Sequence, residues 1–200
     1  MTTTQSPAVP AESETAAQRA RRERILAATL GLASRGGYEA VQMREVAERS
    51  EVALGTLYRY FPSKIHLLVS AMAAEVDRLS ARLQRQAPQG DTRAERVAHV
   101  LERSTRSLQR DPLLTEAMIR AMMAADATVA AEVAAVRANM ADLIVQAIRG
   151  GGEPQEHDVD LAAILQDVWF ARQIAWLGGR IAAADVWRDM HLAIVLVLAD

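Results

Sequence analysis

Helix-forming residues run through almost the whole of this 200-residue chain, and helix-breaking residues are confined to short stretches. No segment shows the alternation of apolar and polar residues expected of a β-strand, and no Asn-Gly hairpin signal occurs. Glycine and proline gather where helices are expected to end, as in "SRGGYE", "YFPSK", "APQGD" and "RGGGEP". The sequence therefore predicts an all-α fold.

The apolar periodicity between these breaks predicts about nine helices, over about 19–34, 43–49, 53–60, 64–86, 92–110, 112–124, 128–149, 158–180 and 184–198. Residues 1–17 are rich in Thr, Ser, Pro and Ala and lack bulky apolar side chains, so we expect a disordered tail. We expect a small N-terminal domain over 18–64 and a larger helical domain over 65–200, joined by the long fourth helix.

What the sequence lacks excludes several classes of protein. The chain has no cysteine, which rules out disulfides and thiolate chemistry. Its four histidines are scattered, and neither an HExxH nor a G-x-S-x-G motif occurs, so we expect no enzyme, no metal site and no cofactor. The N-terminus has no signal-peptide pattern and the apolar run "LAIVLVLA" is too short to cross a bilayer. We therefore expect a soluble, cytoplasmic, nucleoid-associated protein without a membrane partner.

The most specific pattern lies in residues 43–61, "MREVAERSEVALGTLYRYF". Val46, Ala47, Leu57 and Phe61 form one apolar set on two short helices that only about three residues separate. This spacing is typical of a helix-turn-helix, in which the second helix lies in the major groove of DNA. An ordinary helical hairpin, whose tyrosines bury their rings, is the alternative.

The distribution of charge favours the DNA-binding interpretation. Residues 19–64 hold nine basic and five acidic side chains, whereas residues 65–200 hold fourteen basic and eighteen acidic ones. Thr56 and Tyr58 face outward on a helical wheel, and their hydroxyl groups can donate to phosphate oxygens. Lys64 begins the fourth helix, where the helix dipole disfavours a cation, so we expect an anion such as a phosphate or a neighbouring glutamate beside it.

The segment "RRERILAATLGLASRGGYEAVQMREVAERSEVALGTLYRYFPSK" resembles the N-terminal domain of the TetR family of transcriptional regulators, whose hallmark is a recognition helix of the type "GTLYxYFxxK". The helical remainder resembles the ligand-binding and dimerisation domain of that family in size and helix number. The resemblance implies a homodimer that binds double-stranded, palindromic operator DNA and represses transcription until a small molecule binds. An activator, or a helical interaction module without a DNA role, is the alternative.

The resemblance also implies a role for each matching position. Arg44 falls where family members often read a guanine, Gln42 caps the second helix beside a phosphate, and Tyr58 meets both backbone and bases. Glu51 and Ala53 stand where a small turn residue and a serine cap are common. Arg19 and Arg22, near the start of the first predicted helix, are equally consistent with ordinary solvated side chains. The implied DNA-binding residues are Arg19, Arg22, Gln42, Arg44, Ala53, Leu54, Gly55, Thr56, Tyr58, Tyr60 and Lys64.

Four further stretches, "GGYEAVQMR", "GTLYRYFPSK", "PLLTEAM" and "DVW....AWL", resemble a subgroup of the family, the actinobacterial repressors of cholesterol and steroid catabolism. This likeness implies a steroid-derived acyl-CoA thioester as the effector. A family member that answers to another hydrophobic ligand, in efflux or fatty acid metabolism, is the alternative.

Methionine and aromatic side chains gather in the middle of the predicted C-terminal domain. Methionine is flexible and polarizable, and suits an adaptable apolar cavity, although a packed core is the alternative. We expect a pocket for a large hydrophobic effector, lined by Met118, Met122, Met123, Met140, Trp169, Phe170 and Trp176. Arg103, Arg106 and Arg110 repeat along one helix face and either meet the phosphates of an acyl-CoA or form a solvated face.

The last two helices, "LAAILQDVWFARQIAWL" and "MHLAIVLVL", are apolar nearly all round. A helix without a polar face must be buried on every side. Two such helices from each of two subunits would form a four-helix interface, with Leu165, Trp187, Leu192, Val195 and Leu196 as its expected members. An interior helix pair in a monomer is the alternative.

Overall fold

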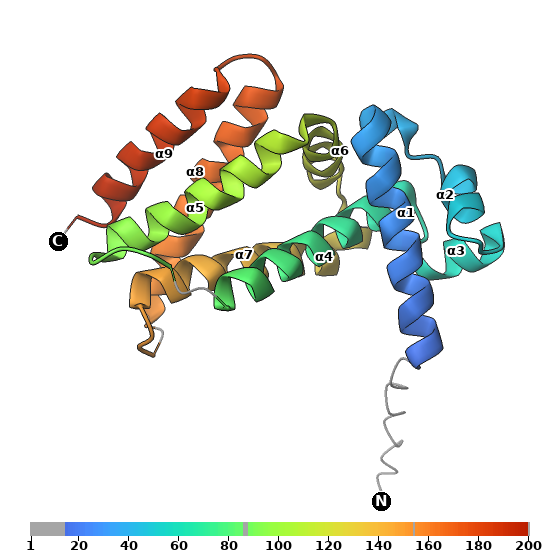
Figure 1. The fold of residues 1–200 in the computed structure, drawn as a ribbon, viewed down its shortest axis with the longest axis horizontal. Helices are drawn as coiled ribbons and strands as arrows, with labels where there is room; N and C mark the ends of the chain where they lie inside the picture. The colour runs from blue at the N-terminus through green and yellow to red at the C-terminus, as the bar shows by residue number, and fades with distance from the viewer. Residues whose placement is uncertain (1–14, 86–87, 154, 200) are drawn as a thin grey trace, which may run out of the picture.

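The computed structural model describes residues 15–85, 88–153 and 155–199, with the side chains of residues 83 and 84 left aside. Within these ranges it contains nine α-helices, one short 3-10 helix and no strand, which confirms the all-α prediction (Figure 1). The helices are α1 (Ala16–Ala40), α2 (Met43–Arg49), α3 (Leu54–Tyr60), α4 (Lys64–Gln84), α5 (Arg93–Arg110), α6 (Pro112–Met123), η1 (Ala127–Val129), α7 (Ala130–Arg149), α8 (Glu156–Leu177) and α9 (Ala183–Val197).

Helix α1 is longer than the sequence indicated at both ends. It begins at Ala16 because Thr15 caps it: the Thr15 hydroxyl accepts from the Gln18 amide, and the Gln18 side chain accepts from the Thr15 amide. The last residues of the expected tail are therefore helical, while residues 1–14 lie outside the described part. At its other end α1 is kinked at Gly36 and Gly37, where φ and ψ are non-helical, and then continues to Ala40.

Helices α1, α2 and α3 form a small N-terminal unit at one end of the molecule, and α4 leads from it into the larger body (Figure 1). The unit is held together by Ile25 of α1 and by members of the apolar set predicted over residues 43–61. Ile25, Val46 and Leu57 are fully buried, and Phe61 is nearly so. In the rest of the chain α4 packs on α7, α5 packs on α7 and α9, and α8 packs on α9.

Helix α6 lies between the N-terminal unit and the body, and packs along α1 (Figure 1). Its start is fixed locally, because Pro112 occupies the first turn and the Asp111 carboxylate accepts from the Leu114 amide as an N-cap. A second internal tie joins α5 to α8, where the Trp169 indole donates to the Thr105 hydroxyl over 2.8 Å in the buried core.

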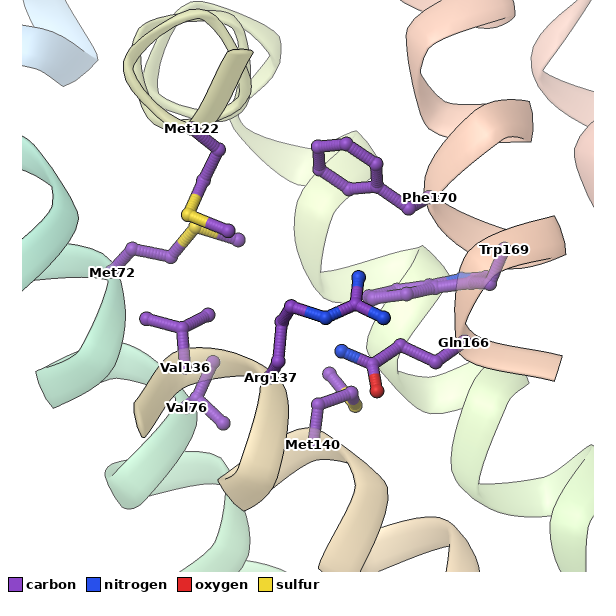
Figure 2. Close-up of a pocket in the computed structure, with 9 residues that line it drawn as sticks. All are labelled: Met72, Val76, Met122, Val136, Arg137, Met140, Gln166, Trp169 and Phe170. Carbon is purple, nitrogen blue, oxygen red and sulfur yellow. The ribbon is translucent and has the colours of Figure 1, made fainter. Parts of the chain in front are cut away.

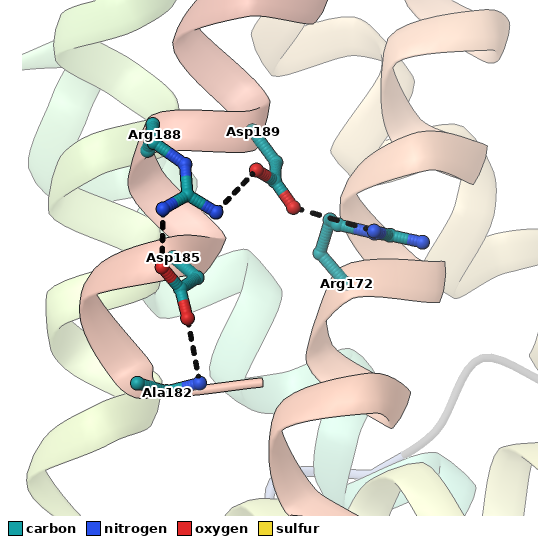
Figure 3. A network of polar contacts seen from close by, with 5 residues as sticks. All are labelled: Arg172, Ala182, Asp185, Arg188 and Asp189. Carbon is teal, nitrogen blue, oxygen red and sulfur yellow. Dashed lines mark hydrogen bonds and ion pairs between the residues drawn. The ribbon is translucent and has the colours of Figure 1, made fainter. Parts of the chain in front are cut away.

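Helices α8 and α9 run side by side at the C-terminal end, and an ion pair joins them next to a polar network on α9 (Figure 3). Arg172 on α8 pairs with Asp189 on α9 at 3.3 Å, and Arg188 pairs with both Asp185 and Asp189. Asp185 also accepts from the Ala182 amide at the start of α9. None of the helices within the described residues is long and apolar enough to cross a membrane.

Candidate DNA-binding surface, effector cavity and subunit interface

The turn between α2 and α3 is a tight helix C-cap. The Val52 amide donates to the Ala47 carbonyl and the Glu51 amide donates to the Glu48 carbonyl, the paired bonds of a Schellman motif. Glu51 occupies the left-handed position of this motif with φ of 55°, which a residue with a side chain adopts at some cost. Glu51 stands where a small turn residue is common, yet the turn keeps its regular geometry.

Helix α3 has one side that is buried in the subunit and one side that is exposed to solvent, which we call its open side. Leu57 is fully buried, whereas Tyr58 is 46% exposed and Leu54 36% exposed. A Cβ built on Gly55 would meet no atom within 4 Å, so the backbone is open to close approach there. Thr56 and Tyr60 are half-buried at the edge of this surface. Ala53 precedes the helix as its N-cap and offers no side-chain cap.

Three arginines of the N-terminal unit have no partner for their charge within the described part of the subunit. Arg19, Arg44 and Arg59 are exposed, and no ion pair or hydrogen bond joins their side chains to any other described residue. Arg49, on α2 with Arg44, is instead paired with Glu45 at 2.9 Å. Two predicted contacts are engaged within the subunit. The Arg22 guanidinium lies 5.6 Å from the centre of the Phe61 ring, and the Gln42 amide donates to the Glu39 carbonyl rather than capping α2.

Lys64 at the start of α4 is partly withdrawn from solvent. Its ammonium lies 3.9 Å from the centre of the Tyr38 ring, and the Arg120 guanidinium lies 4.3 Å from the same ring. Burial lowers the pKa of Lys64 below its usual value, and the nearby Glu39 carboxylate partly offsets this effect. The expected anion beside Lys64 thus includes a carboxylate of its own chain.

Three further contacts complete what we call the α1–α6 contact. The Ser34 hydroxyl donates to the Asp111 carboxylate, and the Tyr38 amide donates to Glu116 over 3.0 Å. Arg120 pairs with Glu39 at 2.9 Å. Gly37, with φ of 64°, allows this approach, since a Cβ there would lie 3.0 Å from the Glu116 carboxylate. The sequence pattern did not find this contact, because its partners are more than seventy residues apart in the chain.

The body contains two adjoining cavities that share Met72, Val76, Met140 and Trp169 in their walls. Cavity A is open to solvent and lies among α4, α5, α6, α7 and α8; about 710 Å³ of empty space, open solvent included, lies within it. Its apolar wall includes Leu79, Met118 and Ile119, and its polar groups are Glu75, Arg82, Ser104, Ser107, Asp111 and Thr115. Asp111, which bonds Ser34 of α1, therefore also lines cavity A.

Cavity B is open to solvent and lies among α4, α6, α7 and α8 (Figure 2); about 380 Å³ of empty space, open solvent included, lies within it. Its wall is apolar apart from Arg137 and Gln166, whose side chains extend from α7 and α8 toward each other. Arg137 pairs with Asp167 at 2.8 Å at the rim. Gln166 is only 7% exposed.

Most of the expected pocket residues line these cavities. Met118 lines cavity A, Met122 and Phe170 line cavity B, and Met140 and Trp169 line both. Met123 and Trp176 line neither cavity. Met123, the last residue of α6, is 62% exposed, and Trp176 is half-buried. The sequence pattern missed Met72 and Val76, because α4 was treated as a connector.

The three arginines of α5 line neither cavity A nor cavity B. Arg106 is exposed and pairs with Glu102 at 2.6 Å, which fits the solvated face left open as the alternative.

The outer side of α9 carries the expected interface residues. Leu192, Val195 and Leu196 are 59%, 48% and 69% exposed, at spacings that place them on one face of the helix. Trp187 is half-buried at the edge of this face. The expectation for Leu165 is wrong, because Leu165 is fully buried in the core of its own subunit. On α8 it is Ile164, 50% exposed, that points outward.

Residues 25–71 match the profile of the bacterial regulatory proteins of the tetR family, and residues 90–197 match a tetracyclin repressor-like C-terminal domain. The HTH-type transcriptional repressor KstR of Rhodococcus jostii is 53% identical over 184 residues, which cover 92% of this chain and 85% of that protein. A TetR transcriptional regulator from Rhodococcus sp. RHA1 has a crystal structure that is 36% identical, with a TM-score of 0.85, and covers 92% of this chain and 98% of that one.

A more distant structure shares the fold. FadR of Thermus thermophilus, described as a TetR family repressor in complex with lauroyl-CoA, is 22% identical with a TM-score of 0.73, over 88% of this chain and 93% of that one. The family matches and the name of the KstR relative confirm the prediction of a regulator that is not an enzyme.

Proposed function

The chain belongs to the TetR family of bacterial regulatory proteins, and we propose that it is a transcriptional repressor that binds a palindromic operator as a homodimer and leaves it when a steroid-derived acyl-CoA binds. The observation that carries the DNA-binding part is the two-sided construction of α3. Its inner side is locked by the fully buried Leu57, while Gly55 and Tyr58 stand open to solvent on the same helix as the exposed, unpaired Arg59.

In this proposal α3 enters the major groove with its open side. Arg44 is free to form a bidentate contact with a guanine, and Tyr58 and Thr56 donate to phosphate oxygens. Lys64 leaves the Tyr38 ring and approaches a phosphate. This move is favourable because partial burial disfavours the charged ammonium group, and the phosphate charge compensates for that cost.

The effector site in this proposal is the pair of cavities A and B. Their walls are mainly apolar and rich in methionine, which suits a bulky hydrophobic ligand. The acyl-CoA class is supported by the lauroyl-CoA described for the FadR repressor that shares the fold. The steroid class is supported by the resemblance to repressors of steroid catabolism and by the KstR relative.

The coupling between the two sites runs through α6 in this proposal. Asp111 lines cavity A, caps α6, and accepts from Ser34 on α1. An effector that displaces the first turn of α6 therefore also strains the α1–α6 contact and shifts the N-terminal unit. Coupling free energies of about 1–3 kcal/mol are typical and are sufficient to release an operator.

The homodimer is formed across the outer faces of α8 and α9 in this proposal. Leu192, Val195 and Leu196 would otherwise form an exposed apolar stripe, which soluble monomers seldom carry. A two-fold axis there places two copies of α3 about 34–36 Å apart, one turn of B-form DNA.

The test is binding to a fragment of the promoter of the protein's own gene, measured by fluorescence anisotropy. Arg44→Ala is expected to weaken binding by about 5- to 150-fold, the effect of losing a bidentate base contact worth about 1–3 kcal/mol. Arg49→Ala is the matched control on the same helix, since Arg49 is already paired with Glu45.

A second variant tests the whole open side. Tyr58→Ala combined with Lys64→Ala is expected to abolish promoter binding while the protein stays folded and dimeric. For the wild-type dimer, two half-sites that each neutralise about four phosphates give a slope of about −7 in a plot of log K against log salt concentration. A double variant that binds the promoter as the wild type does would refute the assignment of α3.

A further inference from the structure

The His66 side chain bridges the joint between α3 and α4 to the body of the molecule. One ring nitrogen, Nδ1, lies 3.0 Å from the Ser63 hydroxyl, and the other, Nε2, lies 2.9 Å from the Thr128 carbonyl. A carbonyl can only accept a hydrogen bond, so Nε2 carries the hydrogen and donates to Thr128. In the neutral ring Nδ1 then accepts from Ser63. Both nitrogens of one half-buried ring are therefore engaged.

Ser63 fixes one end of this His66 bridge next to the DNA-binding helix. Its hydroxyl accepts from the His66 amide over 3.2 Å, which makes Ser63 the N-cap of α4. Only Pro62 separates Ser63 from Phe61, which is buried in the core of the N-terminal unit. The fixed φ of proline leaves this short segment little freedom. The position of His66 is therefore closely coupled to the end of α3.

Thr128 fixes the other end of the His66 bridge to the body. It lies in η1, which packs on α4 and runs directly into α7. The Asp126 carboxylate accepts from both the amide and the hydroxyl of Thr128, at 2.9 and 2.6 Å. Val129, the last residue of η1, is buried. Contacts of the body thus hold the acceptor of the bridge in place.

The N-terminal unit is therefore tied to the body at two separate places. The α1–α6 contact holds it through Ser34, Tyr38 and Glu39 of α1. The His66 bridge holds it through Ser63, at the joint that follows α3. Contacts with α6 alone restrain the α1 side of the unit, whereas the bridge restrains the α3 side. The direction of α3 relative to the rest of its subunit then depends on the bridge.

We propose that His66 is a positioning residue that sets the separation and direction of the two α3 helices in the dimer, and thereby the half-site spacing that the protein accepts. This inference rests on the proposed function, in which two copies of α3 read half-sites about one turn of DNA apart. Each base pair added between the half-sites moves them about 3.4 Å apart and turns them by about 35°. A unit held at both places cannot follow that change, whereas a unit without the bridge follows it in part.

The experiment compares three DNA fragments by fluorescence anisotropy with the full-length protein. They are the palindrome that footprinting locates in the promoter of the protein's own gene, the same palindrome with two base pairs inserted at its centre, and a single half-site. His66→Leu is expected to weaken binding to the native palindrome by about three- to tenfold, since each of two subunits loses one weak hydrogen bond. Binding to the lengthened palindrome and to the half-site is expected to stay unchanged, so the preference for the native spacing falls by the same factor.

Two conservative variants separate the bridge from the local cap of α4. His66→Gln keeps an N–H donor near the position of Nε2 and is expected to retain the spacing preference of the wild type. His66→Asn keeps an acceptor beside Ser63 but is too short to reach Thr128, and is expected to behave as His66→Leu does. Because His66→Asn keeps the cap of α4, it gives the same comparison even if His66→Leu does not fold.

An unchanged spacing preference in both His66→Leu and His66→Asn would overturn this inference and leave the proposed function standing. An equal fall in affinity for all three fragments would also overturn it, because His66 would then only stabilise the fold. A wild type that binds the native and the lengthened palindrome equally well would contradict the proposed binding of a homodimer to a palindrome, and this inference with it.

Discussion

The hydrogen bond between Ser34 and Asp111 is the contact through which we expect the effector cavity to act on the DNA-binding surface. Replacing Ser34 with alanine removes this bond alone. Asp111 keeps its role as the cap of α6, because its carboxylate still accepts from the Leu114 amide. The substitution therefore weakens the tie between the N-terminal unit and α6 without unfolding either.

The size of the effect follows from the environment of the bond. A hydrogen bond to a charged group contributes about 1.5–3 kcal/mol when it is buried. Ser34 and Asp111 are both half-buried, so we take about 1 kcal/mol after screening by solvent. In the proposed coupling, the bond between Ser34 and Asp111 belongs to the arrangement that binds DNA, so its loss disfavours that arrangement. We expect Ser34→Ala to weaken operator binding about fivefold without effector, and to leave binding in saturating effector unchanged.

The assay is fluorescence anisotropy of a labelled promoter fragment, titrated with wild type and variant in the absence and presence of a steroid acyl-CoA. Asp111→Asn is the matched control, because asparagine caps a helix as well as aspartate and still accepts from Ser34. Asp111→Asn should lose less operator affinity than Ser34→Ala does. An equal fall of affinity with and without effector would refute the reasoning, since the bond would then stabilise both states alike.

Three further substitutions test other parts of the structure. Glu51→Gly removes the cost of a side chain at φ of 55°, and we expect chemical unfolding to show a gain of about 0.5–1 kcal/mol, whereas a loss would contradict the turn geometry. Leu196→Asp places a charge on the exposed stripe of α9 and should give monomers in light scattering. Met123→Glu changes a similarly exposed side chain on α6 and should leave the dimer intact. A dimeric Leu196→Asp would exclude this interface. Gln173→Met replaces a fully buried amide without a partner, and should raise the stability by about 1–3 kcal/mol in the same unfolding assay, whereas a fall in stability would contradict this reasoning.

The fold and the DNA-binding surface were accessible from the sequence because their signals are local. Breaks such as Gly36-Gly37 and Pro62 mark where the chain changes direction, and the short spacing between Val46 and Leu57 defines two helices that pack closely. The start of α1 was misjudged, since the reciprocal bonds between Thr15 and Gln18 fix it rather than apolar periodicity.

Contacts between distant segments were not accessible in this way. The bond between Ser34 and Asp111 joins residues 77 positions apart, and nothing in the local pattern of either residue indicates it. Leu165 shows a related limit. A helix that is apolar nearly all round offers no polar side by which to decide which residues face the core and which face outward. Only the packing of α8 assigns Leu165 to the core and Ile164 to the surface.

The cavity was anticipated from its methionines but not from its polar groups. Met118, Met122 and Met140 line cavities A and B, whereas the polar lining residues Gln166 and Asp111 were not expected there. These residues are ordinary in the sequence. The significance of Asp111 comes from its contact with Ser34 of α1.

The most direct test of the account is the affinity of the wild-type protein for its promoter fragment, measured with and without a steroid acyl-CoA that calorimetry has shown to bind. The account predicts that the bound effector weakens operator affinity by about 5- to 150-fold, the range that a coupling free energy of about 1–3 kcal/mol produces. A compound that occupies the protein and leaves operator affinity unchanged would contradict it.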